Sequence, residues 1–80
     1  MGSAAYGELV SVDEHFVTYR FADDDRVKWD GTVVIPVDDV WKWQVTGSSE
    51  RPFAAQAIVT KANRRFKDVG EWPRFVAFQS

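Results

Sequence analysis

Four basic side chains crowd into one short stretch of a chain whose formal net charge is −2. Lys61, Arg64, Arg65 and Lys67 lie within seven consecutive positions, and Arg74 follows shortly after them. Clustered Lys and Arg side chains bind phosphates or acidic protein surfaces, because each is a positively charged hydrogen-bond donor. The same residues also suit the C-terminal end of a helix, where cations interact favourably with the backbone dipole. The candidate interaction surface comprises Lys61, Arg64, Lys67 and Arg74.

Two indoles on one predicted strand could form a platform for a planar ligand. Trp41 and Trp43 are separated by one residue, so an extended backbone would direct both to the same face. Such a face can stack on a sugar, a base or a cationic group. The alternative is that both indoles fill the core of a chain that contains a single Leu. A candidate aromatic pocket between helix and sheet comprises Trp41, Trp43, Phe66 and Phe78.

The other two indoles, Trp29 and Trp72, lie next to predicted turns. An indole in such a position often covers the rim of a core and keeps its N–H exposed. If one face of the sheet has no helix over it, we expect Trp29, Phe16 and Val34 to mark a binding surface on that face.

The residues that commonly carry catalysis or bind metals are sparse. Cys is absent, which removes thiolate chemistry and disulfides. The single His, His15, lies beside Asp13 and Glu14 in a predicted turn, a poor place for the pocket that a catalytic base needs. The aspartates at 23–25 and 38–39 are contiguous rather than alternating, which indicates solvated turns instead of a calcium loop. The sequence therefore predicts no enzyme, no metal site and no cofactor.

Alternating apolar residues predict a β-hairpin over residues 6–21. The alternation runs on both sides of the polar break at residues 13–15, and it indicates that one face of the hairpin is buried. Residues 22–25 then predict a turn, because Asp can hydrogen-bond its own backbone. Residues 26–29 would form either a short strand or a continuation of that loop.

A second hairpin is predicted from residues 32–37 and 40–45, joined by a turn at residues 38–39. Pro36 has no N–H to donate, which suits an edge or an outward-facing position. One face of the second strand would then carry Trp41, Trp43 and Val45.

An amphipathic helix is predicted over residues 51–69. Ser48 or Ser49 can cap its start, Gly70 suits the left-handed residue at its end, and Pro73 lies beyond. Its apolar stripe comprises Ala54, Ala55, Ile58, Val59, Ala62, Phe66 and Val69.

A final strand is predicted over residues 74–79. Phe75 and Ala77 would lie on one face, and Val76 and Phe78 on the other. Because both faces are apolar, we expect this strand in the interior of the sheet.

These elements predict an α+β fold with the order β-β-β-β-α-β. It would be a small antiparallel-rich sheet of four to five strands with one amphipathic helix packed on one face. The 80 residues indicate a single domain, 1–80, in which residues 1–5 are flexible. The aromatic content of 15% favours strands as well.

Charge is divided unevenly along the chain. Residues 1–50 hold ten acidic and four basic side chains, whereas residues 51–80 hold two acidic and six basic. Either the two halves attract each other within the fold, or one face is basic enough to meet an acidic partner.

We therefore expect a small, soluble, non-enzymatic binding or interaction protein. Its partner would be another protein or a second copy of the chain, bound through a free sheet edge or the basic helix face. The alternatives are nucleic-acid binding by the basic helix face and carriage of a small ligand in the aromatic pocket. Abundant Ala, Val, Arg and Asp, with one Asn and two Ile, indicate a GC-rich bacterial genome. No apolar run approaches the ~20 residues that cross a bilayer, so we expect a cytoplasmic location and no membrane contact.

Overall fold

The structure, a computed structural model, describes residues 4–22, 29, 31–47 and 51–79, without the side chain of Gln79. The predicted turn at 22–25 beyond Ala22, most of the segment 26–29, and the cap candidates Ser48 and Ser49 lie outside these residues. Within the described part, the elements follow the predicted order: β1 (Ala4–Val12), β2 (Phe16–Ala22), β3 (Gly31–Pro36), the short 3-10 turn η1 (Val40–Lys42), β4 (Gln44–Val45), α1 (Phe53–Val69) and β5 (Phe75–Gln79).

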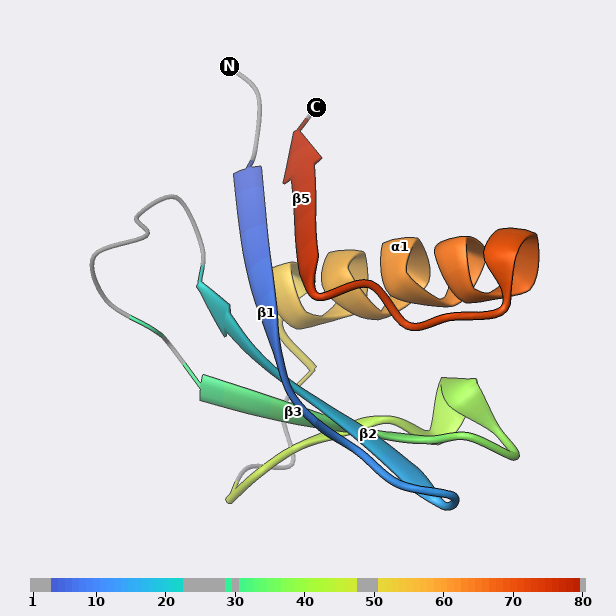
Figure 1. Ribbon diagram of the computed structural model, residues 1–80. Coiled ribbons are helices and arrows are strands. Elements are labelled where there is room, and N and C mark those ends of the chain that lie inside the picture. Colours follow the sequence, from blue (N-terminus) through green and yellow to red (C-terminus); the bar gives the residue numbers. More distant parts are fainter. Residues whose placement is uncertain (1–3, 23–28, 30, 48–50, 80) are drawn as a thin grey trace.

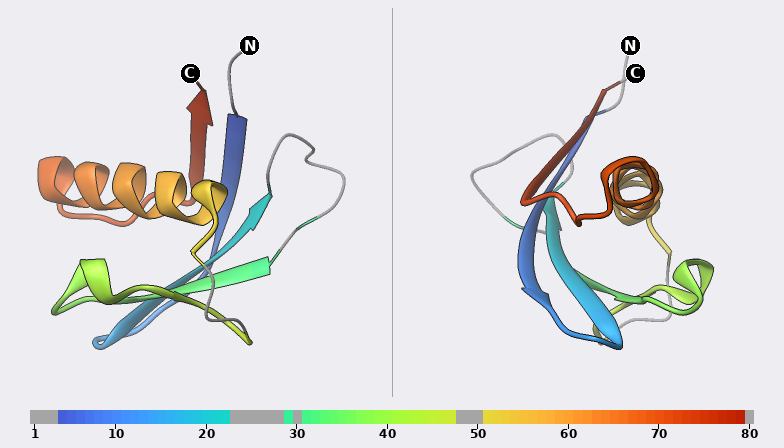
Figure 2. Two further views of the ribbon diagram at one scale, coloured as in Figure 1. Left: turned by 180° about the vertical axis from the view of Figure 1, so that it is seen from behind. Right: turned by 45° about the vertical axis from the view of Figure 1, so that its right-hand side comes forward.

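The strands form one antiparallel sheet with the order β4-β3-β2-β1-β5. The helix α1 packs on one face of this sheet, which curves around it (Figures 1 and 2). The predicted α+β architecture is therefore confirmed. Because the first and last strands are neighbours, the N-terminal end of β1 lies beside the C-terminal end of β5 (Figure 1).

The sheet face toward α1 is apolar and buried. Alternate residues of β2 and β3 fill it, as the predicted one-sided hairpin requires. Gly7 of β1 allows α1 to approach closely, since a Cβ atom there would lie 2.7 Å from Cγ2 of Ile58. The largest fully buried side chains are Tyr19, Ile35, Ile58, Val17, Val33 and Val59.

A β-bulge interrupts the alternation of β1. Leu9 and Ser11 both have partners on β2, which leaves Val10 as an extra residue. Beyond the bulge, Val12 lies opposite Val17, a core residue, so Val12 is directed to the face that carries α1. Val12 nevertheless remains 52% exposed, because it lies next to the turn that joins β1 to β2.

The second predicted hairpin is present, but its second strand is shorter than residues 40–45. Val40–Lys42 form a 3-10 turn, and only Gln44–Val45 pair with β3. Because a 3-10 turn rotates successive side chains by about 120°, Trp41 and Trp43 do not share a face. Trp43 is 2% exposed, whereas Trp41 is 55% exposed.

The last strand, β5, lies at an edge of the sheet and not in its interior. It pairs with β1, and no described strand pairs with its other side. The prediction of an interior strand is wrong, because apolar residues on both faces do not determine which strands lie beside β5; only one of the two faces is covered. Val76 is 3% exposed on the covered face, whereas Phe75 is 53% exposed on the other.

The ends of α1 differ in how closely they match expectation. Pro52 is the N-cap residue and provides no side-chain hydrogen bond. At the other end, Gly70 adopts the predicted left-handed conformation (φ 80°), and its N–H donates to the carbonyl of Phe66 at 2.8 Å.

The expectation that residues 1–5 are flexible stays a prediction, and of these residues the structure describes Ala4 and Ala5. Both residues belong to β1 and pair with β5, and Ala5 is completely buried opposite Phe78. Among the described residues, no helix combines the length and the apolar character that crossing a lipid bilayer requires.

Candidate functional site

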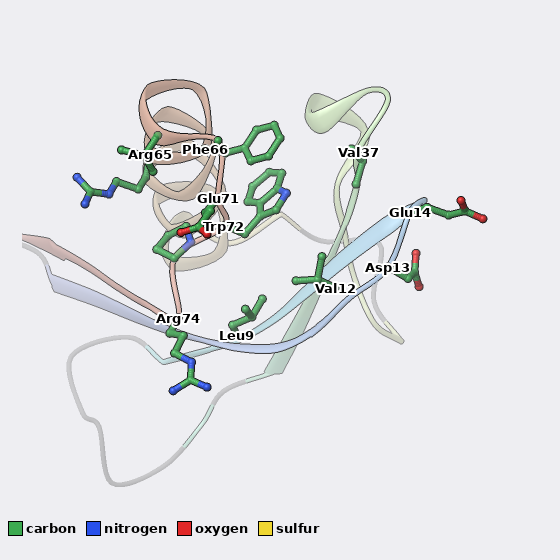
Figure 3. A pocket seen from close by; sticks show the side chains of 13 residues that line it. Leu9, Val12, Asp13, Glu14, Val37, Arg65, Phe66, Glu71, Trp72 and Arg74 are labelled. Carbon is green, nitrogen blue, oxygen red and sulfur yellow. The ribbon is translucent and has the colours of Figure 1, made fainter.

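Three of the four residues in the candidate interaction surface share one face of α1. Lys61, Arg64 and Lys67 recur three residues apart, and all three are exposed. None of them forms an ion pair with a carboxylate in the described part of the chain. Arg74 follows the helix, and its guanidinium is directed away from α1 (Figure 3). The structure therefore does not bring Arg74 to the other three cations.

A groove of about 280 Å³ lies between α1 and β5. The helix crosses β5 and continues past its outer edge, as two opposite views show (Figures 1 and 2). Phe53 and Phe78 form the apolar end of the groove, with ring centroids 5.5 Å apart in an edge-to-face contact. We call this the strand-edge groove; its lining residues are Phe53, Gln56, Ala57, Thr60, Lys61, Arg64 and Phe78.

The outer edge of β5 adds backbone hydrogen-bonding groups to this groove. The N–H of Leu9 donates to the carbonyl of Arg74 at 2.9 Å, and the register continues with Gly7 opposite Val76. Hydrogen-bonded and non-hydrogen-bonded pairs alternate along an antiparallel ladder. The backbone of Val76 therefore faces β1, whereas the N–H and C=O of Ala77 face outward, where no described strand pairs with them.

A larger groove, of about 820 Å³, lies between the end of α1, the segment that leads into β5, and the end of the first hairpin. One wall is a stacked aromatic pair, Phe66 and Trp72, with ring centroids 4.6 Å apart and planes inclined by 12°. Figure 3 shows apolar side chains of β1 and of Val37, the residue after β3, opposite this wall. We call this the indole groove; its apolar lining consists of Leu9, Val12, Val37, Phe66, Val69 and Trp72.

Backbone contacts fix the position of Trp72. Gly70 reverses the chain after α1, and the next two carbonyls beyond Trp72 are both bound. The carbonyl of Pro73 accepts a hydrogen bond from the Tyr19 hydroxyl at 2.5 Å, and that of Arg74 accepts from the Leu9 N–H. Burial raises the pKa of Tyr19 above its usual value, so this hydroxyl stays protonated and continues to donate.

The last turns of α1 line the indole groove instead of entering the core. The predicted apolar stripe is buried from Ala54 to Ala62, but Phe66 is half-buried and Val69 is 52% exposed. The reason is geometric, because α1 extends beyond the strands on which it packs (Figure 1). Helical periodicity identified these residues as apolar and could not show that the sheet ends before them.

The four residues of the candidate aromatic pocket lie in different places. Trp43 is in the core, with the guanidinium carbon of Arg51 4.3 Å from its ring centroid. Trp41 borders a separate hollow of about 300 Å³ beside α1. Phe66 lines the indole groove and Phe78 lines the strand-edge groove. The four therefore do not line one common pocket.

The sheet face opposite α1 is covered by no described helix. Phe16 is 47% exposed there, and Val34 is half-buried on the neighbouring strand. Trp29 reaches the same face, since its ring centroid lies 4.5 Å from the guanidinium carbon of Arg20. Arg20 also forms an ion pair with Glu8. The three residues expected on an uncovered face are therefore there, but the ring of Trp29 already stacks against a cation.

The turn of the first hairpin is organised by Asp13. Its carboxylate accepts the backbone N–H groups of Phe16 at 2.7 Å and of His15 at 2.8 Å. The hydrogen bond from Phe16 lowers the pKa of Asp13 below its usual value, and the bond from His15 lowers it further. The imidazole of His15 lies 3.5 Å from the Glu14 carboxylate and its side chain is 69% exposed. The contacts of Asp13, Glu14 and His15 therefore stabilise the turn of the first hairpin.

Sequence reasoning placed Trp72 at the rim of the core, where it is half-buried, but missed its partnership with Phe66. The one available signal was Gly70 between them, which predicts a chain reversal and leaves the direction of the following residues open. No protein-family model matches the chain, and no significant similarity to a curated protein or to a solved structure was found.

Proposed function

We propose that this chain is a non-enzymatic interaction domain that binds an extended, acidic segment of another protein along the outer edge of β5. One observation carries this proposal: the strand-edge groove joins the outer edge of β5, with which no described strand pairs, to Lys61 and Arg64 of α1. The two surfaces that the sequence suggested separately, a sheet edge and a basic helix face, form one continuous surface.

The backbone supplies the first half of the recognition. An extended segment can add to a sheet by hydrogen-bonding the outward N–H and C=O groups of an edge strand, here those of Ala77 and its alternate neighbour Phe75. Side chains of the added strand would alternate between the two sheet faces. Those on the same face as Phe78 would enter the strand-edge groove beside Ala57.

The helix supplies the second half. Lys61 and Arg64 are exposed and form no ion pair within the described residues, so a carboxylate of the partner can approach both. At the other end of the groove, Phe53 is 54% exposed and offers an apolar contact. The partner segment should therefore alternate apolar and acidic side chains, and its affinity should fall as ionic strength rises.

Binding of synthetic peptides tests this proposal. A fluorescent peptide that alternates Val and Glu should bind saturably, and a matched peptide that alternates Val and Lys should not. The double substitution Lys61→Glu with Arg64→Glu should lower the affinity for the Val-Glu peptide by about ten-fold and raise the affinity for the Val-Lys peptide. Lys42→Glu, an exposed charge reversal outside the groove, is the control and should leave both affinities unchanged. Equal binding of both peptides, or of neither, would overturn the acidic-segment proposal.

A backbone substitution tests the strand edge separately. Ala77→Pro removes an outward N–H and no bond to β1, so the fold should persist while peptide binding is lost. Ala77→Val keeps the N–H and should bind like the parent chain. Peptide binding that survives Ala77→Pro but not the double charge reversal would assign recognition to the helix face alone. Concentration-dependent dimerisation that Ala77→Pro abolishes, without peptide binding, would make the partner a second copy.

A further inference from the structure

We infer that the indole groove is a second binding site, which takes a small, neutral, planar aromatic molecule that carries a hydrogen-bond acceptor. This site is separate from the strand-edge groove, since the two share no lining residue. The inference rests on the shape of the groove, on the indole N–H and on the distribution of charge.

The shape favours a flat molecule. Phe66 and Trp72 stack face to face with planes inclined by 12°, so Phe66 covers one face of the indole and holds it in a fixed plane. The volume of about 820 Å³ lies within the usual range of small-molecule sites. A planar ring can lie between the nitrogen-bearing edge of Trp72 and Val37, where it can contact Val12 as well (Figure 3).

The indole of Trp72 supplies one hydrogen-bond donor. Figure 3 shows its nitrogen-bearing edge turned toward Val37, across the groove. This N–H donates no hydrogen bond to any residue that the structure describes. A ligand acceptor in the groove would replace the water that the N–H otherwise binds, and it would fix the orientation of the ring.

The charged residues around the groove favour a neutral ligand. The guanidinium groups of Arg65 and Arg74 and the carboxylates of Asp13 and Glu14 are directed away from the space between Trp72 and the opposite wall (Figure 3). The carboxylate of Glu71, the fifth charged residue of the lining, lies on the opposite side of the indole from its nitrogen (Figure 3). No charge from these five residues therefore meets a ligand at the N–H edge. A charged ligand would lose hydration without gaining a partner there.

The groove is also held open before any ligand binds. The Tyr19 hydroxyl holds Pro73, and Gly70 fixes the chain reversal, so Trp72 does not have to move into place. A site that is already formed avoids the cost of ordering its side chains on binding.

Coumarin, which is planar, neutral and carries a carbonyl acceptor, is a suitable probe, and naphthalene is its counterpart without an acceptor. In a titration followed by NMR, coumarin should shift the indole N–H resonance of Trp72, and naphthalene should bind about five-fold more weakly. Trp72→Phe keeps a stacking ring but removes the donor, so this variant should bind the two probes equally. Trp41→Phe alters an exposed indole outside the groove and should change neither affinity.

Four results would overturn the inference. They are an unmoved Trp72 N–H at millimolar coumarin, equal affinity of the parent chain for the two probes, an undiminished preference for coumarin in Trp72→Phe, and stronger binding of a cationic or anionic analogue of coumarin. If Trp72→Phe fails to fold, Val12→Lys serves instead. It places a charge in the groove from an exposed position, and it should abolish coumarin binding without lowering the melting temperature (Tm) markedly.

Discussion

The two grooves beside α1 are built in opposite ways. The strand-edge groove lies between two regular elements, and it combines a free strand edge with two cations of the helix face. The indole groove is built around a chain reversal, and its wall consists of two aromatic rings from either side of Gly70. The first can recognise a backbone and a pattern of charge, whereas the second offers apolar shape and one hydrogen-bond donor.

This difference shows how one helix can serve two kinds of recognition. The N-terminal part of α1 is held against β1 and β5, and its outward face meets the strand edge. The C-terminal part extends past the sheet, so its apolar residues remain available to a groove. A substitution that moves the whole of α1 should therefore affect both grooves. A substitution that moves only the chain reversal at Gly70 should affect the indole groove alone.

The largest effect is expected from Gly7→Val, which should disturb both grooves. Even a Cβ atom at this position would lie 2.7 Å from Cγ2 of the fully buried Ile58, so α1 has to move away from β1. Overpacking of this kind costs about 3 kcal/mol, which corresponds to a fall of more than about 10 °C in Tm. Thermal unfolding followed by circular dichroism measures this effect. An unchanged Tm with both grooves functional would show that the close approach of α1 is not required.

The second-largest effect is expected from substitution of two glycines, only one of which lies at the indole groove. Gly70 and Gly47 have nearly the same left-handed φ, 80° and 77°, and an added Cβ would meet nothing within 4 Å at either. Substitution of either by Ala should therefore cost about 1–2 kcal/mol of stability. Only Gly70→Ala should also weaken the binding of coumarin to the indole groove, because only Gly70 directs the chain toward Trp72. Equal loss of coumarin binding in both variants would mean that general destabilisation is the cause.

A smaller effect is expected from Tyr19→Phe. The variant keeps the buried ring but loses the hydrogen bond to the Pro73 carbonyl, which should cost about 1 kcal/mol. The indole N–H resonance of Trp72 should broaden or shift, and the Val-Glu peptide should bind as before. Weaker peptide binding with an unaltered Trp72 resonance would contradict the assignment of this bond to the indole groove.

The smallest effect is expected from pH at the hairpin turn. The folded chain holds the pKa of Asp13 below its usual value of about 3.9, so the stabilisation is complete above that value. It is lost as the pH falls through the lowered pKa, because a protonated Asp13 accepts the two N–H bonds less strongly. The amide resonances of Phe16 and His15 should follow this titration. In the Asp13→Ala variant, neither amide resonance should show this pH titration, and Tm should fall by less than about 4 °C.

Much of the fold follows from periodicity. Alternation identified β2 and β3, and the helical stripe with its terminal Gly70 identified α1 to within two residues at its start and at the correct residue at its end. Sequence patterns of this kind report which side chains are apolar at which spacing. They carry no information on which strand lies at an edge, and for this reason the position of β5 was predicted wrongly.

The candidate site was predictable only in part. Lys61, Arg64 and Lys67 share a face as expected, because their spacing lies within one helix. Trp41 and Trp43 separate because Val40–Lys42 form a 3-10 turn, a choice that local apolar alternation does not reveal. The pairing of Phe66 with Trp72 and the outward backbone of Ala77 depend on tertiary placement, which no local pattern encodes.

The pairing of β1 with β5 has a consequence for synthesis of the chain. β1 emerges from the ribosome before the other described strands, but one of its two neighbours consists of residues 75–79, which emerge much later. Throughout that interval one side of β1 has no native partner, and unpaired strand edges are sites of premature association. This side of β1 is therefore protected only once β5 has been synthesised, and the arrival of β5 at the same time creates the edge that we propose receives a partner.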